Sequence, residues 1–130
     1  MKYLGIRTDT PLCEMYLYED RVLLSKDEWQ ADRELAKLLL GKIEAFLATN
    51  NTAFKNLGGV FAFRGPGSFT GLRIGLTVIN TVAYAEQLPV VGAQGETWRD
   101  DAVSRLLAGE TDEMILPLYG ADPRITLPKK

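Results

Sequence analysis

Histidine is absent from this 130-residue sequence. Without it, the Ser-His-Asp and Cys-His arrangements that activate a nucleophile cannot form, and most zinc sites lose a usual ligand. The single cysteine, Cys13, excludes an internal disulfide and favours a reducing compartment. We expect Cys13 to be buried filler in an apolar stretch. The composition thus removes many enzyme classes, and we expect no catalytic residue, no metal and no cofactor.

Excess charge and long apolar runs are also missing. The formal net charge is −2, so strong direct binding to nucleic acid, which needs clustered Lys and Arg, is not expected. The longest apolar region, residues 72–85, is interrupted by polar side chains and falls short of a membrane span. No charged leader followed by an apolar run opens the sequence. We therefore expect a cytoplasmic protein with no membrane partner.

Hydrophobic periodicity and turn residues predict one α/β domain. We expect strands at residues 2–8, 12–18, 21–25, 57–63 and 89–93, and helices at residues 27–49, 69–87 and 96–108. Asp27 and Gln30 resemble a capping box at the start of the first helix. Residues 114–118 are compatible with a last strand. The order β-β-β-α-β-α-β-α predicts a five-stranded mixed sheet with helices packed on it, over residues 1–118, followed by a tail at 119–130.

Two of these helices carry extended apolar surfaces. The first has a stripe of apolar residues spaced by three and four: Leu35, Leu38, Leu39, Ile43, Phe46 and Leu47. The second is apolar nearly all round, with residues Leu72, Leu76, Ile79 and Ala83 on one side and Ile74, Val78, Val82 and Ala85 elsewhere. Gly71 and Gly75 would leave a flat strip beside them. We expect a partner to cover part of this helix; the alternative, cover by the first helix, stays open.

A glycine-rich turn at residues 64–75 joins a predicted strand to the second helix. Such a join gathers free N–H groups at the positive end of a helix dipole, so it is a candidate anion site: Gly65, Gly67, Ser68 (the expected N-cap), Thr70 and Gly71. It is not a P-loop, because no Lys follows Gly71, and Thr70 breaks the dinucleotide pattern. Pro66 breaks the nucleophile elbow. The alternative is that the glycines only allow a tight turn and close helix–sheet packing.

Residues 65–75, Gly-Pro-Gly-Ser-Phe-Thr-Gly-Leu-Arg-Ile-Gly, resemble the signature of the TsaB (YeaZ) family, paralogues of the threonylcarbamoyl transferase TsaD. The likeness extends over the opening strands, residues 35–47 and residues 80–92. It implies a single actin-like (ASKHA, ribonuclease H-like) lobe. It also implies a non-catalytic subunit that supports TsaD, with the ATPase TsaE, in making threonylcarbamoyladenosine (t6A) on tRNA, with only indirect tRNA contact.

In this family the first two helices form a bundle with TsaD or with a second copy. They match residues 28–49 and 69–87 here. The resemblance therefore implies a partner interface formed by Leu35, Leu39, Ile43, Leu72, Arg73, Leu76, Ile79, Asn80 and Ala83.

Two departures from the family pattern weaken an enzymatic interpretation. Arg7 stands where typical members carry an acidic residue in the first strand, and an arginine cannot hold magnesium. Typical members also continue into a second lobe, and nucleotides in this superfamily sit between the lobes. Two rival functions remain: a small nucleotide- or phosphate-binding module that uses the Gly65–Gly71 turn, and a self-associating structural protein.

Overall fold

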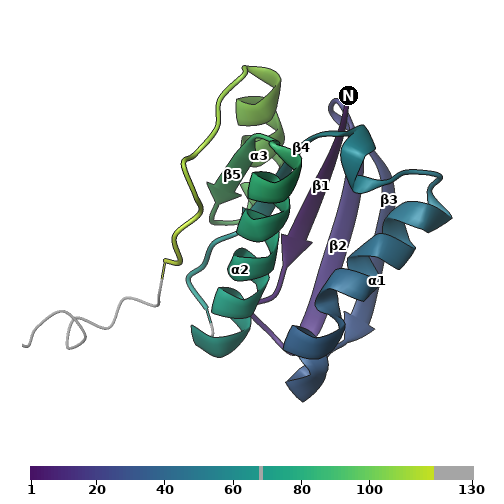
Figure 1. Cartoon of the computed structure of the whole chain (residues 1–130). Helices are drawn as coiled ribbons and strands as arrows, with labels where there is room; N and C mark the ends of the chain where they lie inside the picture. Colours follow the sequence, from purple (N-terminus) through teal and green to yellow (C-terminus); the bar gives the residue numbers. More distant parts are fainter. Residues whose placement is uncertain (68, 119–130) are drawn as a thin grey trace, which may run out of the picture.

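A computed structural model describes residues 1–67 and 69–118 of the chain. Its centre is a five-stranded sheet with the order β3-β2-β1-β4-β5, in which the first three strands are antiparallel and β4 and β5 run parallel to β1 (Figure 1). The strands are β1 (Lys2–Arg7), β2 (Leu12–Glu19), β3 (Val22–Gln30), β4 (Leu57–Phe63) and β5 (Val90–Ala93). The predicted mixed α/β sheet is confirmed.

In the described residues, three α-helices cover the two faces of this sheet. One face carries α1 (Leu35–Thr49) and α2 (Phe69–Glu86), and α3 (Trp98–Leu107) packs on the other (Figure 1). Short 3-10 turns, η1 (Asp32–Glu34) and η2 (Phe54–Asn56), precede α1 and β4. No helix in the described part of the chain is long and apolar enough to cross a membrane.

Because side chains alternate along a strand, the two faces of the sheet have different cores. Beneath α1 and α2 the core is mainly aliphatic, and its fully buried members include Leu4, Ile6, Leu39, Ile43, Leu72 and Ile79. Beneath α3 it is aromatic. Trp98 of α3 packs against Tyr16, Phe61 and Phe63, with ring centroids 5.7–5.8 Å apart. Aromatic pairs at such separations add to the stability gained from burial.

The glycine strip of α2 lies against the chain's own first strand. A Cβ atom at Gly75 would sit 2.0 Å from the Thr8 hydroxyl oxygen. That hydroxyl donates a 2.8 Å hydrogen bond to the carbonyl of Gly71. The expectation that Gly71 and Gly75 leave a flat strip for a partner helix is therefore wrong, because Thr8 fills the space.

The first helix begins later than predicted. Residues 22–30 continue as a strand that pairs with the full length of β2, from Glu19↔Val22 to Leu12↔Gln30. Asp27 and Gln30 consequently lie in β3 and form no capping box, and α1 starts only at Leu35. The segment forms a strand despite its helix-capping pattern, because pairing with β2 gives hydrogen-bond partners to many of its backbone groups at once.

The structure also tests the predictions for Cys13, for Leu38 and for residues 114–118. Cys13 is fully buried, as predicted, and burial raises the pKa of its thiol to about 12. Leu38 is 38% exposed and so lies outside the buried stripe of α1. Residues 114–118 do not form a strand. Ile115 is buried, but its backbone hydrogen-bonds to the side chain of Asn80 on α2 and not to a neighbouring strand. The predicted tail at 119–130 lies outside the described residues.

The close approach of α2 to β1 can be tested with two glycine substitutions. Gly75→Ala inserts a methyl group against Thr8, and we expect it to lower the free energy of unfolding by roughly 1–3 kcal/mol. Gly41→Ala is the control, because a Cβ there meets nothing within 4 Å; it should stabilise α1 by about 0.5–1 kcal/mol. Urea denaturation measures both. Equal stability of Gly75→Ala and wild type would contradict the packing described.

Candidate functional site

The apolar side chains predicted for a partner interface belong to the chain's own core. Each has a relative exposure of 5% or less: Leu35, Leu39, Ile43, Leu72, Leu76, Ile79 and Ala83. They form the inward stripes of α1 and α2, which the sheet already covers. In the chain alone these side chains therefore expose almost no surface, and their assignment to a partner interface stays a prediction.

The two polar residues predicted for the interface differ from each other. Arg73 is exposed and lines a hollow on the outer side of α2. Asn80 is half-buried, and its side-chain amide pairs with the backbone of Ile115: its nitrogen donates to the carbonyl at 3.0 Å, and its oxygen accepts from the amide at 2.8 Å. Asn80 thus fixes the backbone at Ile115, whereas the Arg73 side chain is exposed; the interface role predicted for both stays a prediction.

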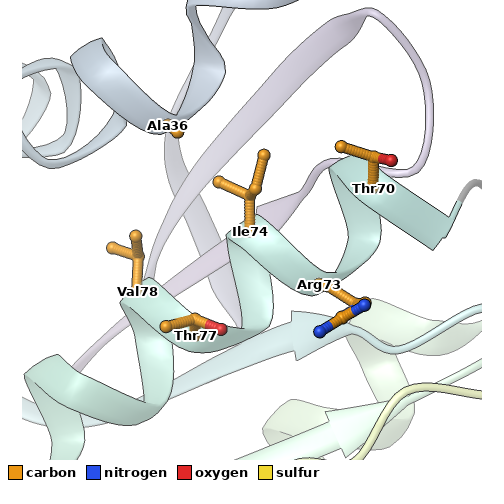
Figure 2. Close-up of a pocket in the computed structure, with 6 residues that line it drawn as sticks. All are labelled: Ala36, Thr70, Arg73, Ile74, Thr77 and Val78. Carbon is orange, nitrogen blue, oxygen red and sulfur yellow. The ribbon is translucent and has the colours of Figure 1, made fainter.

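A groove runs between α1 and α2 on the surface. Its central hollow, about 410 Å³, lies between Ala36 of α1 and the outer side of α2, from which Thr70, Ile74 and Val78 project (Figure 2). A hollow of about 650 Å³ adjoins it and shares Thr70 and Ile74. A third, of about 290 Å³, shares Val78 and extends toward residues 81–86. Shared lining residues make the three hollows one continuous groove.

The central and the 290 Å³ hollows of the groove are poor in charge. Among the described residues, Arg73 is the one charged residue that lines the central hollow, and Glu86 is the one that lines the 290 Å³ hollow. Leu40, which also lines the latter, is 47% exposed. Charge concentrates instead at the η1 end, where Asp32, Arg33 and Glu34 line the largest hollow. Depletion of charge around exposed aliphatic groups is typical of the centre of a protein–protein interface.

Sequence reasoning missed the residues that form this groove. Ile74 and Val78 were placed on a different side of the helix from Leu72 and Leu76, but the predicted interface was drawn on the Leu72 side. The missed signal is the choice of outward residues on α2, where Thr and Ala stand in place of the usual Lys and Glu: Thr70, Thr77, Thr81 and Ala85.

The glycine-rich turn is occupied by a carboxylate of the chain itself. A Cβ at Gly67 would lie 2.5 Å from the Asp9 Cβ and 3.3 Å from its Oδ2. Arg7 holds this carboxylate through hydrogen bonds of 2.8 and 3.2 Å, and its guanidinium also stacks on Phe63 at 3.8 Å. An added phosphate would meet a like charge at this point. The arrangement therefore disfavours an anion at Gly67.

The other members of the candidate anion site have structural or surface roles. Gly65 has a φ of +119°, a conformation that favours glycine, and the backbone of Leu118 lies against it. The carbonyl of Gly71 accepts from Thr8, and Thr70 lines the groove. Ser68 lies outside the described residues. Within residues 1–67 and 69–118, no group of three or more Cys, Asp or Glu residues is placed to hold a metal ion.

Comparison with known proteins adds family information to this geometry. Residues 29–94, about half of the chain, match the family model described as TsaD, tRNA N6-adenosine threonylcarbamoyltransferase. The tRNA threonylcarbamoyladenosine biosynthesis protein TsaB of Escherichia coli (strain K12) is 33% identical in an alignment of 115 positions that covers 83% of this chain and 49% of that protein. The chain thus spans about half the length of this relative.

Solved structures agree with the sequence matches. YeaZ from Pseudomonas aeruginosa superposes with a TM-score of 0.65 and 29% identity, over 72% of this chain and 43% of that one. RuvC from T. thermophilus in complex with a Holliday junction substrate has a TM-score of 0.51 at 16% identity, over 84% of this chain and 77% of that one, which is a likeness of fold alone.

The fold is thus that of an actin-like, ribonuclease H-like α/β lobe with a groove between its first two helices. More specifically, the chain belongs to the TsaB (YeaZ) family. The resemblance drawn from residues 65–75 is confirmed.

The occupied glycine turn makes a prediction for ligand binding. Because Asp9 lies against Gly67, we expect isothermal titration with ATP, ADP and inorganic phosphate to give no heat of binding. A heat of binding that disappears in Gly67→Val would contradict this and would restore the phosphate-binding interpretation.

Proposed function

We propose that this chain is a cytoplasmic, non-catalytic subunit that supports TsaD in forming threonylcarbamoyladenosine on tRNA. In this proposal it binds TsaD directly, meets TsaE through TsaD, and contacts tRNA only indirectly. The observation that carries the proposal is the charge-poor groove between α1 and α2. The TsaB relatives, which are tRNA threonylcarbamoyladenosine biosynthesis proteins, and the match to the TsaD family model support the pathway.

The groove has dimensions that suit a partner helix. Its lining on α2 extends from Thr70 to Glu86, a rise of about 24 Å at 1.5 Å per residue. A helix laid along it would pack between α1 and α2 as in a helical bundle. Ile74, Val78 and Leu40 would then lose their remaining exposure, while Arg73 would remain at the edge to meet a polar group.

The chemistry of the described residues supports a non-catalytic role. The sequence has no histidine, and Arg7 and Asp9 satisfy each other rather than a substrate or a metal. The glycine turn packs α2 against the sheet. Binding is therefore the activity that these surfaces support best.

A second candidate function uses the same groove. A second copy of this chain could lay its α1–α2 face against the first, which would give a homodimer. Ile74 and Val78 of each copy would then cover each other, and no charged pair would be needed. Sedimentation with and without TsaD separates the two: a dimer that TsaD does not dissociate would favour self-association.

The proposed interface is tested by a charge placed in the groove. Val78 is half-buried at the surface, so Val78→Asp should leave the fold intact but bury an unpaired carboxylate in the complex. Such a charge costs several kcal/mol, and we expect affinity for TsaD of the same organism to fall by roughly a hundredfold or more. Co-purification and titration measure this loss.

Leu107→Asp provides the matched control. Leu107 is a 37% exposed leucine on α3, on the opposite face of the sheet, so its replacement should leave TsaD binding unchanged. Circular dichroism confirms that both variants are folded. If Val78→Asp bound TsaD as tightly as Leu107→Asp, the groove would not be the docking face.

A further inference from the structure

The outer edge of the sheet at β5 would be open to strand addition if nothing covered it. β5 pairs in parallel with β4. On this side, the carbonyl oxygens of Pro89 and Ala93 accept hydrogen bonds from the amides of Val60 and Arg64. Since a parallel strand directs alternate residues to opposite sides, the N–H and C=O groups of Val90 and Gly92 face outward. Unpaired groups in such a row are a template for another chain.

Each of these outward groups has a partner outside the sheet. The amide of Val90 donates to the Thr111 hydroxyl at 2.9 Å, and its carbonyl accepts from the amide of Asp112 at 2.7 Å. The amide of Gly92 donates to the Asp112 carboxylate at 2.8 Å. Its carbonyl accepts from Arg105 at 3.4 Å. The edge is therefore saturated without a sixth strand.

The groups that close the edge are themselves held in place. Arg105 of α3 donates to Asp112 at 2.7 Å and to Glu110 at 2.8 Å. Burial acts to raise the pKa of Asp112, but hydrogen bonds from Arg105 and the Gly92 amide and the nearby positive charges outweigh it, so this pKa lies below its usual value. Farther along, Asn80 clamps Ile115. Asp112 thus remains ionised and fixed at neutral pH.

The opposite edge of the sheet is protected differently. β3 presents Lys26, Asp27 and Glu28 in succession, and Lys26 pairs with Glu28 at 3.1 Å. Charged side chains oppose strand addition because pairing would desolvate them. β5 has the sequence Val-Val-Gly-Ala and carries no charge of its own, so its protection has to come from elsewhere in the chain.

We propose that Thr111, Asp112 and Arg105 form a clasp that closes β5 to strand addition by a second copy of this chain. With β5 closed, copies of the chain can associate only through other surfaces. This inference does not depend on whether TsaD is the partner. A chain that lacks it exposes an uncharged strand edge and associates through β5.

The clasp is tested with Thr111→Val/Asp112→Ala, studied by sedimentation velocity against wild type at equal concentrations. We expect the double variant to form larger species that wild type does not form. Adding Val90→Pro should abolish them, because proline removes the outward N–H and blocks strand addition. Absence of larger species, or larger species that persist with Val90→Pro, would overturn the proposal.

A single isosteric variant covers the case in which the double variant does not fold. Thr111→Val keeps the side-chain shape but removes the acceptor for the Val90 amide. Amide hydrogen exchange at Val90 should become roughly tenfold faster, as expected for one lost hydrogen bond. Glu110→Ala, which alters a contact of Arg105 but none of β5, should leave this rate unchanged. Unchanged exchange in Thr111→Val would also overturn the proposal.

Discussion

The contact between Gly75 of α2 and Thr8 at the end of β1 determines how the second helix lies on the sheet. Because Gly75 has no side chain, the Thr8 side chain lies directly against the backbone of α2, which favours one rotation of the helix about its own axis. Leu72 and Ile79 are thereby turned into the core, and Val78 is turned toward α1. This one contact is thus consistent with both the aliphatic core beneath α2 and the side chains that α2 leaves at the surface.

Elsewhere, the chain satisfies its exposed polar groups with its own residues. Asp9 lies against the glycine turn and is held there by hydrogen bonds from Arg7, and Thr111 and Asp112 close the edge of β5. The groove between α1 and α2 has no comparable internal cover among the described residues. Its few charges and exposed aliphatic groups make it the surface on which burial by another helix would gain most.

Local patterns predicted the elements well where local structure decides them. The strand at 57–63 and the helix from 69 followed from an apolar run and a glycine turn. β3 was extended past its predicted end because its pairing with β2 is non-local. The sequence separated the Leu76 side of α2 from the Val78 side but could not tell which one faces the sheet, because both residues are apolar. The segment at 114–118 has strand-like composition, but Asn80, distant in sequence, satisfies Ile115 instead.

The central claim is that a partner docks on the outer surface of α1 and α2 while the buried stripes beneath stay in the core. Methyl NMR spectra of the labelled chain, recorded with unlabelled TsaD of the same organism, test it most directly. We expect the methyl signals of Leu40, Ile74 and Val78 to shift or broaden, while those of Leu23 on β3 and Leu107 on α3 do not. Changes centred on Leu23 or Leu107, with Ile74 and Val78 unaffected, would contradict it.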